Sequence, residues 1–76
     1  MESTTQQAIR VIREKAERSG FTLSDVAYAA GIDKAQVSRW STGKHIPLYS
    51  AVIKLREACD ALVEVRLALL QKESQQ

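Results

Sequence analysis

The chain has 76 residues, of which 45% are hydrophobic, and its formal net charge is +2. A chain of this length forms one small domain with a core near the lower limit for independent folding. No apolar run approaches the ~20 residues that span a bilayer, and the start lacks a secretory signal, so no membrane association and a cytoplasmic setting are expected. The single cysteine and the single histidine, Cys59 and His45, offer too few ligands for a metal site.

The sequence also argues against an enzyme. Its one histidine lies close to a proline in a predicted loop, and no glycine-rich phosphate loop or paired-acid motif stands out. We therefore expect no catalytic residues and no cofactor.

The first helix is predicted to begin at the Ser3-Thr4-Thr5 cap and to end at Ser19-Gly20. Between these points, small and apolar residues recur at helical spacing, which predicts an amphipathic helix with its inner face formed by Ala8, Ile9, Val11, Ile12 and Ala16.

The second helix is predicted to begin in "FTLSDV". Thr22 can cap it, Asp25 can return the hydrogen bond three residues later, and Phe21 can pack on Val26.

The same pattern returns eleven residues later in "IDKAQV", where Asp33 is the cap, Gln36 its reciprocal partner and Ile32 the residue that packs on Val37. Two helix N-termini only eleven residues apart leave room for two short helices joined by a tight turn. Gly31 fits that turn because glycine adopts positive φ without a Cβ penalty.

The inner and outer faces of the third helix can be separated by spacing. Val37 and Trp40 are three residues apart and are predicted to face inward, whereas Ala35, Ser38, Arg39 and Thr42 fall on the other side. In the preceding helix Val26 and Ala30 face the core, and Ala27 is small where the next helix crosses. This arrangement is typical of two helices joined at roughly 90–120°.

Charge distribution gives a second indication. Five basic residues and no acid occur between Lys34 and Arg56, the basic residues being Lys34, Arg39, Lys44, Lys54 and Arg56. They form either an ordinary solvated surface or an electrostatic footprint for a polyanion. A protruding helix with such side chains can enter the major groove of DNA.

The third helix is predicted to end at Thr42-Gly43 and a fourth to begin at Pro47. Its core positions are Val52, Leu55, Cys59, Leu62 and Val63. The tail "DALVEVRLALLQ" is apolar on more than one face. One stripe, Leu62, Val65 and Leu69, is enough to close the core, and a second, Val63, Leu67 and Leu70, predicts self-association.

The sequence therefore predicts an all-α fold of four or five helices. Residues 4–60 are assigned to a DNA-binding domain, and residues 61–76 to a C-terminal oligomerisation helix with a frayed tail.

The run "LSDVAYAAGIDKAQVSRWSTGKHIP" resembles the helix-turn-helix of the lambda-repressor and Cro superfamily. Within that superfamily, "AGIDKAQVSRW" and the later "IP" are most similar to lambdoid phage CII-type regulators. The resemblance implies a compact lambda-repressor-like domain and a phage-type repressor or activator. It also implies base contacts from the recognition helix (about residues 34–42), namely Lys34, Ala35, Gln36, Ser38 and Arg39, and phosphate contacts near Thr22, Thr42 and Lys44.

The expected partner is a double-stranded DNA operator bound by a homodimer, or by a homotetramer if the resemblance extends to the assembly. RNA polymerase would be a further partner of an activator. Two alternatives reuse the same scaffold: a protein-interaction module, and a small antitoxin whose apolar tail covers a toxin.

Overall fold

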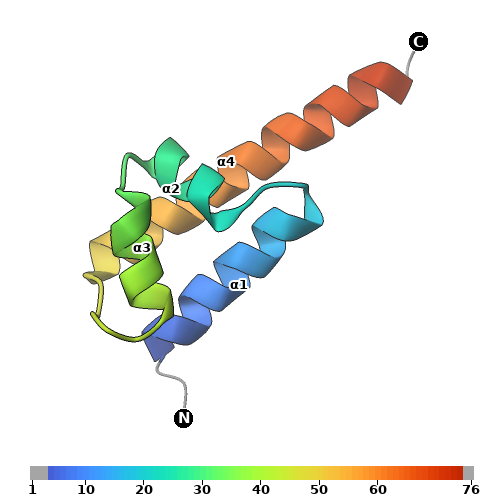
Figure 1. Cartoon of the computed structure of the whole chain (residues 1–76). Coiled ribbons are helices and arrows are strands. Elements are labelled where there is room, and N and C mark those ends of the chain that lie inside the picture. Colours follow the sequence, from blue (N-terminus) through green and yellow to red (C-terminus); the bar gives the residue numbers. More distant parts are fainter. Residues whose placement is uncertain (1–3, 75–76) are drawn as a thin grey trace.

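The computed structural model describes residues 4–74 as four helices, with no strand in that range (Figure 1). They are α1 (Thr4–Arg18), α2 (Leu23–Ala30), α3 (Lys34–Ser41) and α4 (Tyr49–Ser74). The all-α prediction is confirmed. Ser3, one of the predicted cap residues of α1, lies outside the described residues.

The cap of α2 forms as predicted. The Asp25 backbone N–H donates to the Thr22 hydroxyl at 3.2 Å, and the Thr22 backbone N–H donates to the Asp25 carboxylate at 2.8 Å. Two backbone donors at the start of the helix are thus satisfied by local side chains, which fixes where α2 begins.

The turn between α2 and α3 is built around Gly31, whose φ of 72° lies in the left-handed region. Asp33 then caps α3, but its carboxylate accepts from the Ala35 backbone N–H at 2.9 Å. The predicted return bond from Gln36 is wrong, because the exposed Gln36 side chain forms no such bond among the described residues. The cap therefore depends on Asp33 alone.

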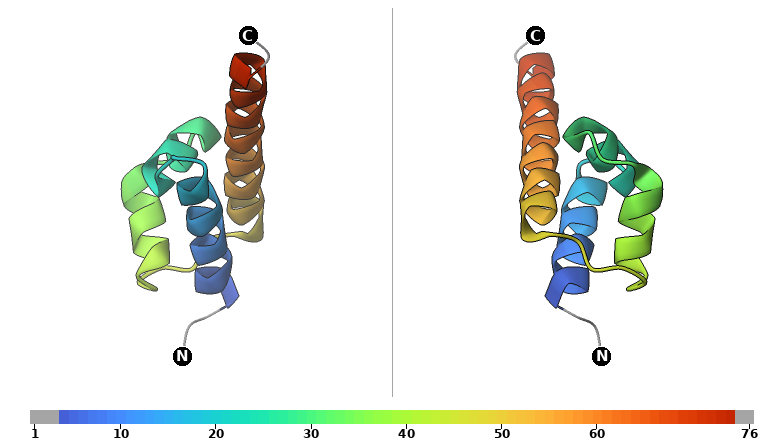
Figure 2. Two further views of the ribbon diagram at one scale, coloured as in Figure 1. Left: turned by 90° about the vertical axis from the view of Figure 1, so that its right-hand side faces the viewer. Right: turned by 90° about the vertical axis from the view of Figure 1, so that its left-hand side faces the viewer.

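The helices pack so that α1 and α2 cover the first half of α4, while α3 rests on α1 and α2. Figure 2 shows α3 and α4 on opposite sides of α1. The buried core is contributed by all four helices and consists of Ile9, Ile12, Ala16, Val26, Ala27, Val37, Trp40, Leu55 and Cys59. Val37 and Trp40 anchor α3 from its inner face, as predicted, and Ala27 is the small buried residue at the crossing.

One predicted core position of α1 is wrong. Val11 was expected on the inner face of α1, but 57% of its surface is exposed. Buried Ile9, Ile12 and Ala16 follow each other at intervals of three and four residues, and Val11 lies outside this stripe. It lines a groove between α1 and α4 instead.

The start of α4 also differs from the prediction. The helix begins at Tyr49 rather than Pro47, and the Leu48 carbonyl accepts from the backbone N–H groups of Ala51 and Val52 at 3.0 and 3.2 Å. Pro47 is buried in the preceding loop. From Tyr49 the helix is continuous to Ser74, so the boundary predicted at residues 60–61 coincides with no break in secondary structure.

The far half of α4 extends beyond the packed body (Figure 1). Leu62 and Val63 are still partly buried against the core. The next large apolar residues, Val65, Leu67, Leu69 and Leu70, are exposed. The prediction that the Leu62, Val65 and Leu69 stripe closes the core is therefore wrong beyond Leu62, because α4 has passed the helices that cover its first half.

Within the described part of the chain, no helix combines the length and apolar content needed to cross a bilayer.

Candidate nucleic-acid interface

The outer face of α3 carries all five residues expected to contact bases. Lys34, Ala35, Gln36, Ser38 and Arg39 are exposed, whereas Val37 and Trp40 are buried. Successive residues turn by roughly 100° around a helix, so Ala35 lies most directly opposite the buried pair, with Ser38 and Arg39 at about equal angles to either side of that direction. Lys34 lies beyond Ser38 on the edge toward α2, and Gln36 lies beyond Arg39 on the opposite edge.

Arg39 and Lys34 have no ion-pair partner among the described residues. A surface salt bridge would have been the ordinary structural explanation for Arg39. With the guanidinium and ammonium groups free on the outer face, both keep their full donor capacity for a ligand, and these are the groups that pair with guanine O6 and N7.

One edge of this face is a shallow depression of about 240 Å³ between the start of α2 and α3. Its polar lining consists of Arg13, Ser24, Lys34, Ser38 and Ser41. Arg13, Ser24 and Ser41 were missed by sequence reasoning. Arg13 reaches the depression from α1 through tertiary packing that no local pattern reports, but Ser24 at the second position of α2 carried a usable signal, since helix N-termini bind phosphate.

The other edge is a depression of about 190 Å³ lined by Gln36, Arg39, Trp40, His45 and Ile46. It forms because the loop after α3 folds back on the helix: the backbone N–H groups of Lys44 and His45 donate to the Arg39 carbonyl at 3.0 and 3.4 Å. Gly43, with φ of 82°, permits this return. The exposed side chains of Lys44 and His45 are therefore carried by a loop tied to Arg39.

The three predicted phosphate-contact residues are exposed but differ in free donors. Lys44 keeps its whole ammonium group. The Thr22 hydroxyl accepts a capping bond and retains its proton for donation. The Thr42 hydroxyl already donates to the Arg39 carbonyl at 3.2 Å, so a phosphate contact would require it to rotate.

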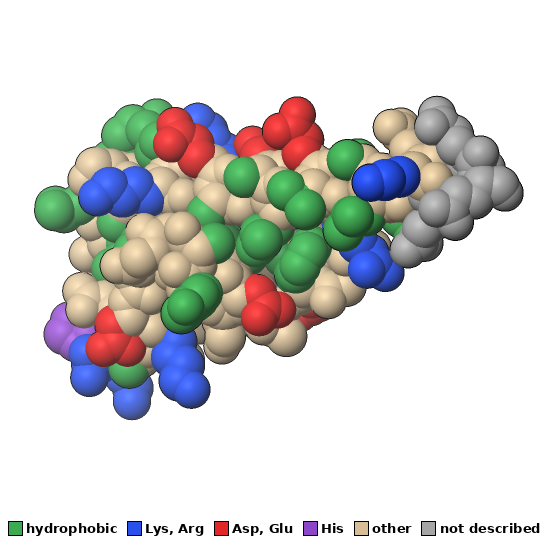
Figure 3. Space-filling model, turned by 90° about the horizontal axis from the view of Figure 1, so that it is seen from above, with side chains coloured by type: hydrophobic (Ala, Val, Ile, Leu, Met, Phe, Trp, Pro, Cys, Tyr) green, Lys and Arg blue, Asp and Glu red, His purple; other side chains and the backbone are tan. Residues whose placement is uncertain are grey.

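The basic run in the sequence does not form one surface. Lys34, Arg39 and Lys44 are carried by α3 and its following loop, and Figure 3 shows Lys and Arg side chains gathered at that corner of the molecule. Lys54 lines a separate depression with Ile32 and Pro47, and Arg56 lies in the groove between α1 and α4. The basic surface around α3 therefore contains three of the five residues of the run, together with Arg13 from α1.

A comparison with protein-family models matches the helix-turn-helix domain over residues 8–70. The chain belongs to the helix-turn-helix domain family. The matched range contains α2, the Gly31 turn and α3, and it extends along α4 to Leu70. No curated protein and no solved structure matches the chain. The helix-turn-helix family membership supports DNA as the partner.

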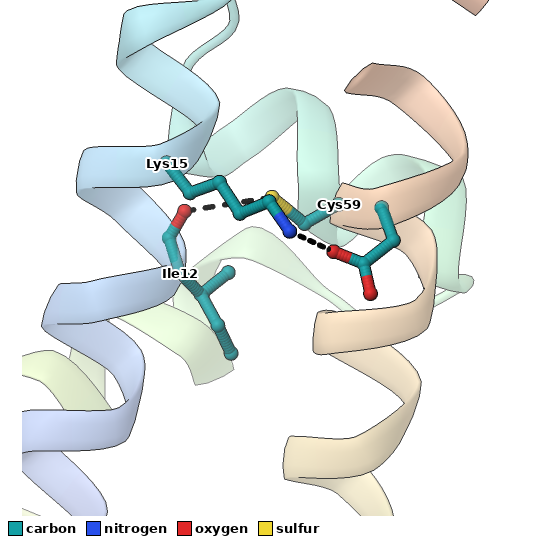
Figure 4. Close-up of polar contacts among 4 residues, drawn as sticks. Ile12, Lys15 and Cys59 are labelled. Carbon is teal, nitrogen blue, oxygen red and sulfur yellow. Dashed lines mark hydrogen bonds and ion pairs between the residues drawn. The ribbon is translucent and has the colours of Figure 1, made fainter. Parts of the chain in front are cut away.

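The other reactive side chains have structural explanations. Cys59 packs in the core with its Sγ 3.6 Å from the Ile12 carbonyl oxygen, and burial raises the pKa of its thiol (Figure 4). Beside it, Lys15 Nζ lies 2.5 Å from Asp60 Oδ1, and the hydrogen bond to that carboxylate raises the pKa of Lys15 (Figure 4). Across the residues described, no three His, Cys, Asp or Glu side chains are grouped as metal ligands.

Proposed function

We propose that this helix-turn-helix protein is a sequence-specific transcription regulator that inserts α3 into the major groove of double-stranded DNA as a homo-oligomer. The observation that supports this most directly is the division of α3 into two faces. Val37 and Trp40 hold the helix on the core, whereas the Arg39 side chain is exposed on the outer face and has no ion-pair partner among the described residues.

The proposed division of labour follows from the geometry. Ala35 occupies the centre of the outer face, where base edges would lie, and Ser38 and Arg39 stand to either side of it. Arginine can bind guanine in bidentate fashion, and the alanine methyl group can contact the methyl group of thymine. The DNA backbone would pass on both sides of this centre. Lys44 lies on one side, and Ser24 and Arg13 lie on the other, so we assign phosphate contacts to these three residues.

Like the phage CII-type regulators that its sequence resembles, the protein would act on an operator near a promoter. Whether it represses or recruits RNA polymerase would depend on the position of that operator.

Selection of bound sequences from random duplexes, followed by footprinting of the winning site, tests the proposal. A specific regulator should enrich a defined motif, with protection centred on it, and should bind the motif roughly 10³-fold or more tightly than random duplex at the same salt concentration. Equal binding to all duplexes would contradict specific regulation. An absence of duplex binding would favour the protein-interaction alternatives.

A further inference from the structure

A groove of about 470 Å³ runs between α1 and α4, and the DNA-recognition face takes no part in it. Its apolar surface comes from Ala8, Val11 and Ile12 of α1 and from Val52 and Cys59 of α4. Lys15 and Asp60 join across it through their ion pair. Val11 is 57% exposed in the groove, so an apolar segment that covered it would gain free energy by removing this surface from water.

The groove continues along α4 into the exposed tail. Val63, Leu67 and Leu70 recur at intervals of four and three residues from the groove residues Val52, Arg56 and Asp60, so all of them lie on the same face of the helix. Figure 3 shows exposed hydrophobic side chains along this protruding half. The apolar face thus has one part beside α1 and one part beyond it.

Symmetry then limits how two copies can meet. α3 and α4 lie on opposite sides of α1 (Figure 2). A two-fold axis along α4 would turn the recognition faces of the two copies in opposite directions. An axis perpendicular to α4, running from the α4 side to the α3 side, leaves both recognition helices facing the same way and pairs the two α4 helices antiparallel.

We propose that the occupant of the groove is the C-terminal part of α4 from a second copy, laid antiparallel, with each tail filling the groove of the other. The lengths agree: the groove follows α4 from Val52 to Asp60, roughly 12 Å, and the exposed tail from Val65 to the end of the helix is roughly 14 Å. The two-fold axis crosses α4 near Val63, where the body ends and the tail begins.

This inference rests on the proposed function, because the demand that both α3 helices face one side comes from binding a single duplex. To the proposed homo-oligomer, the inference adds the antiparallel orientation of the two copies and the participation of the α1 surface. It also predicts that the two half-sites of the operator are inverted repeats.

The first test is sedimentation equilibrium of three lysine variants of the full chain. Val11 and Val65 are equally exposed, at 57%, but Val65 lies on the other side of α4 from Leu67. V11K and L67K should each raise the dimer dissociation constant by roughly tenfold or more, while V65K should leave it within about threefold of wild type. Circular dichroism must show unchanged helix content. A dimer that survives V11K, or that V65K disrupts as strongly as L67K, overturns the proposal.

The second test measures orientation through a spin label on S50C at the start of α4. The native thiol of Cys59 is buried, so the label attaches to the introduced one in the folded protein. An antiparallel pair centred near Val63 places the two labels roughly 40 Å apart, and a parallel pair brings them to roughly 10–20 Å. A short distance overturns the antiparallel arrangement.

DNA binding separates this inference from the proposed function. If the protein enriches a DNA motif but remains monomeric or pairs in parallel, the proposed regulator function is supported. The proposed filling of the groove by a second copy is then contradicted. An antiparallel dimer that binds no duplex would support the proposed filling of the groove and contradict the proposed regulator function.

Discussion

Arg39 and Lys44 lie next to each other in the structure, yet we expect them to act differently on DNA. R39A should cost roughly 1–3 kcal/mol at the specific site and relax the preference at one base position, because we propose that the exposed guanidinium of Arg39 binds a base. K44A should weaken binding to specific and random DNA alike and reduce the salt slope by about one, because we assign Lys44 a phosphate contact. Titrations of both duplexes at several salt concentrations measure these effects.

R18A is the matched control, since it removes the same charge at the exposed end of α1. It should leave both affinities close to those of wild type. If R39A lowered affinity equally for every sequence, Arg39 would be a phosphate ligand and its base-reading role would be lost.

Trp40 belongs to the fold rather than to the DNA surface. It is 95% buried, so W40A should destabilise the domain by ~3–5 kcal/mol, which for so small a core threatens cooperative folding. Y28A removes an aromatic side chain that is 89% exposed and should change stability little. Urea unfolding of both variants measures the contrast. An unchanged midpoint for W40A, with lost DNA binding, would place Trp40 against the ligand.

Cys59 provides a probe of the same core. Because burial raises the pKa of its thiol, the folded protein holds little reactive thiolate, and alkylation by iodoacetamide should be much slower in the native state than in urea. The sign for stability follows: above the ordinary thiol pKa the unfolded chain loses a proton that the folded chain keeps, so this group lowers stability as the pH rises. The introduced thiol of S50C should react rapidly in the folded protein, and equal rates at both positions would contradict the burial of Cys59.

Among the elements, the Gly31 turn fixes the angle between α2 and α3. A Cβ at Gly31 would meet no atom within 4 Å, so the cost of G31A comes from the left-handed backbone itself and should be about 1–2 kcal/mol. G31N should cost less, because asparagine tolerates this conformation. Thermal unfolding of both variants tests this: equal losses would contradict the expectation that tolerance of the left-handed conformation sets the cost.

The helix starts could be predicted from sequence because their causes are local. Thr22 and Asp25 bond to each other across three residues, and Gly31 takes positive φ through its own lack of a side chain. Val37 and Trp40 were placed inward by spacing alone. The predictions that depended on packing were less successful: Val11 has apolar character, but its burial depends on where α4 crosses α1.

The site shows the same limit. The outer face of α3 follows from helical spacing, so all five base-contact candidates were predicted to be exposed and are. Arg13 lies beside the outer face of α3 only because α1 packs against α3, whereas Arg56 lies in the groove between α1 and α4 although it belongs to the same basic run. The actual contacts to bases and phosphates remain predictions.

For the whole molecule, the proposed dimer would connect assembly with DNA recognition through the exposed tail. Leu70 is 46% exposed on the same face of α4 as Leu67, so L70K should give a monomer that remains helical. One helix-turn-helix reads few base pairs, and a second unit held by the dimer converts the second contact into an intramolecular event. Wild type should therefore bind a two-half-site operator roughly 10²–10⁴-fold more tightly than a single half-site.

L70K should lose most of that gain while binding a single half-site as tightly as wild type does, because its α3 is untouched. Fluorescence titration of the two duplexes measures both quantities, with V65K as the variant that keeps the gain. A loss on the single half-site as well would mean that the tail supports the fold of the recognition unit rather than its pairing. If wild type bound the two-half-site operator no more tightly than the single half-site, and sedimented as a monomer on DNA, one copy alone would make the specific complex.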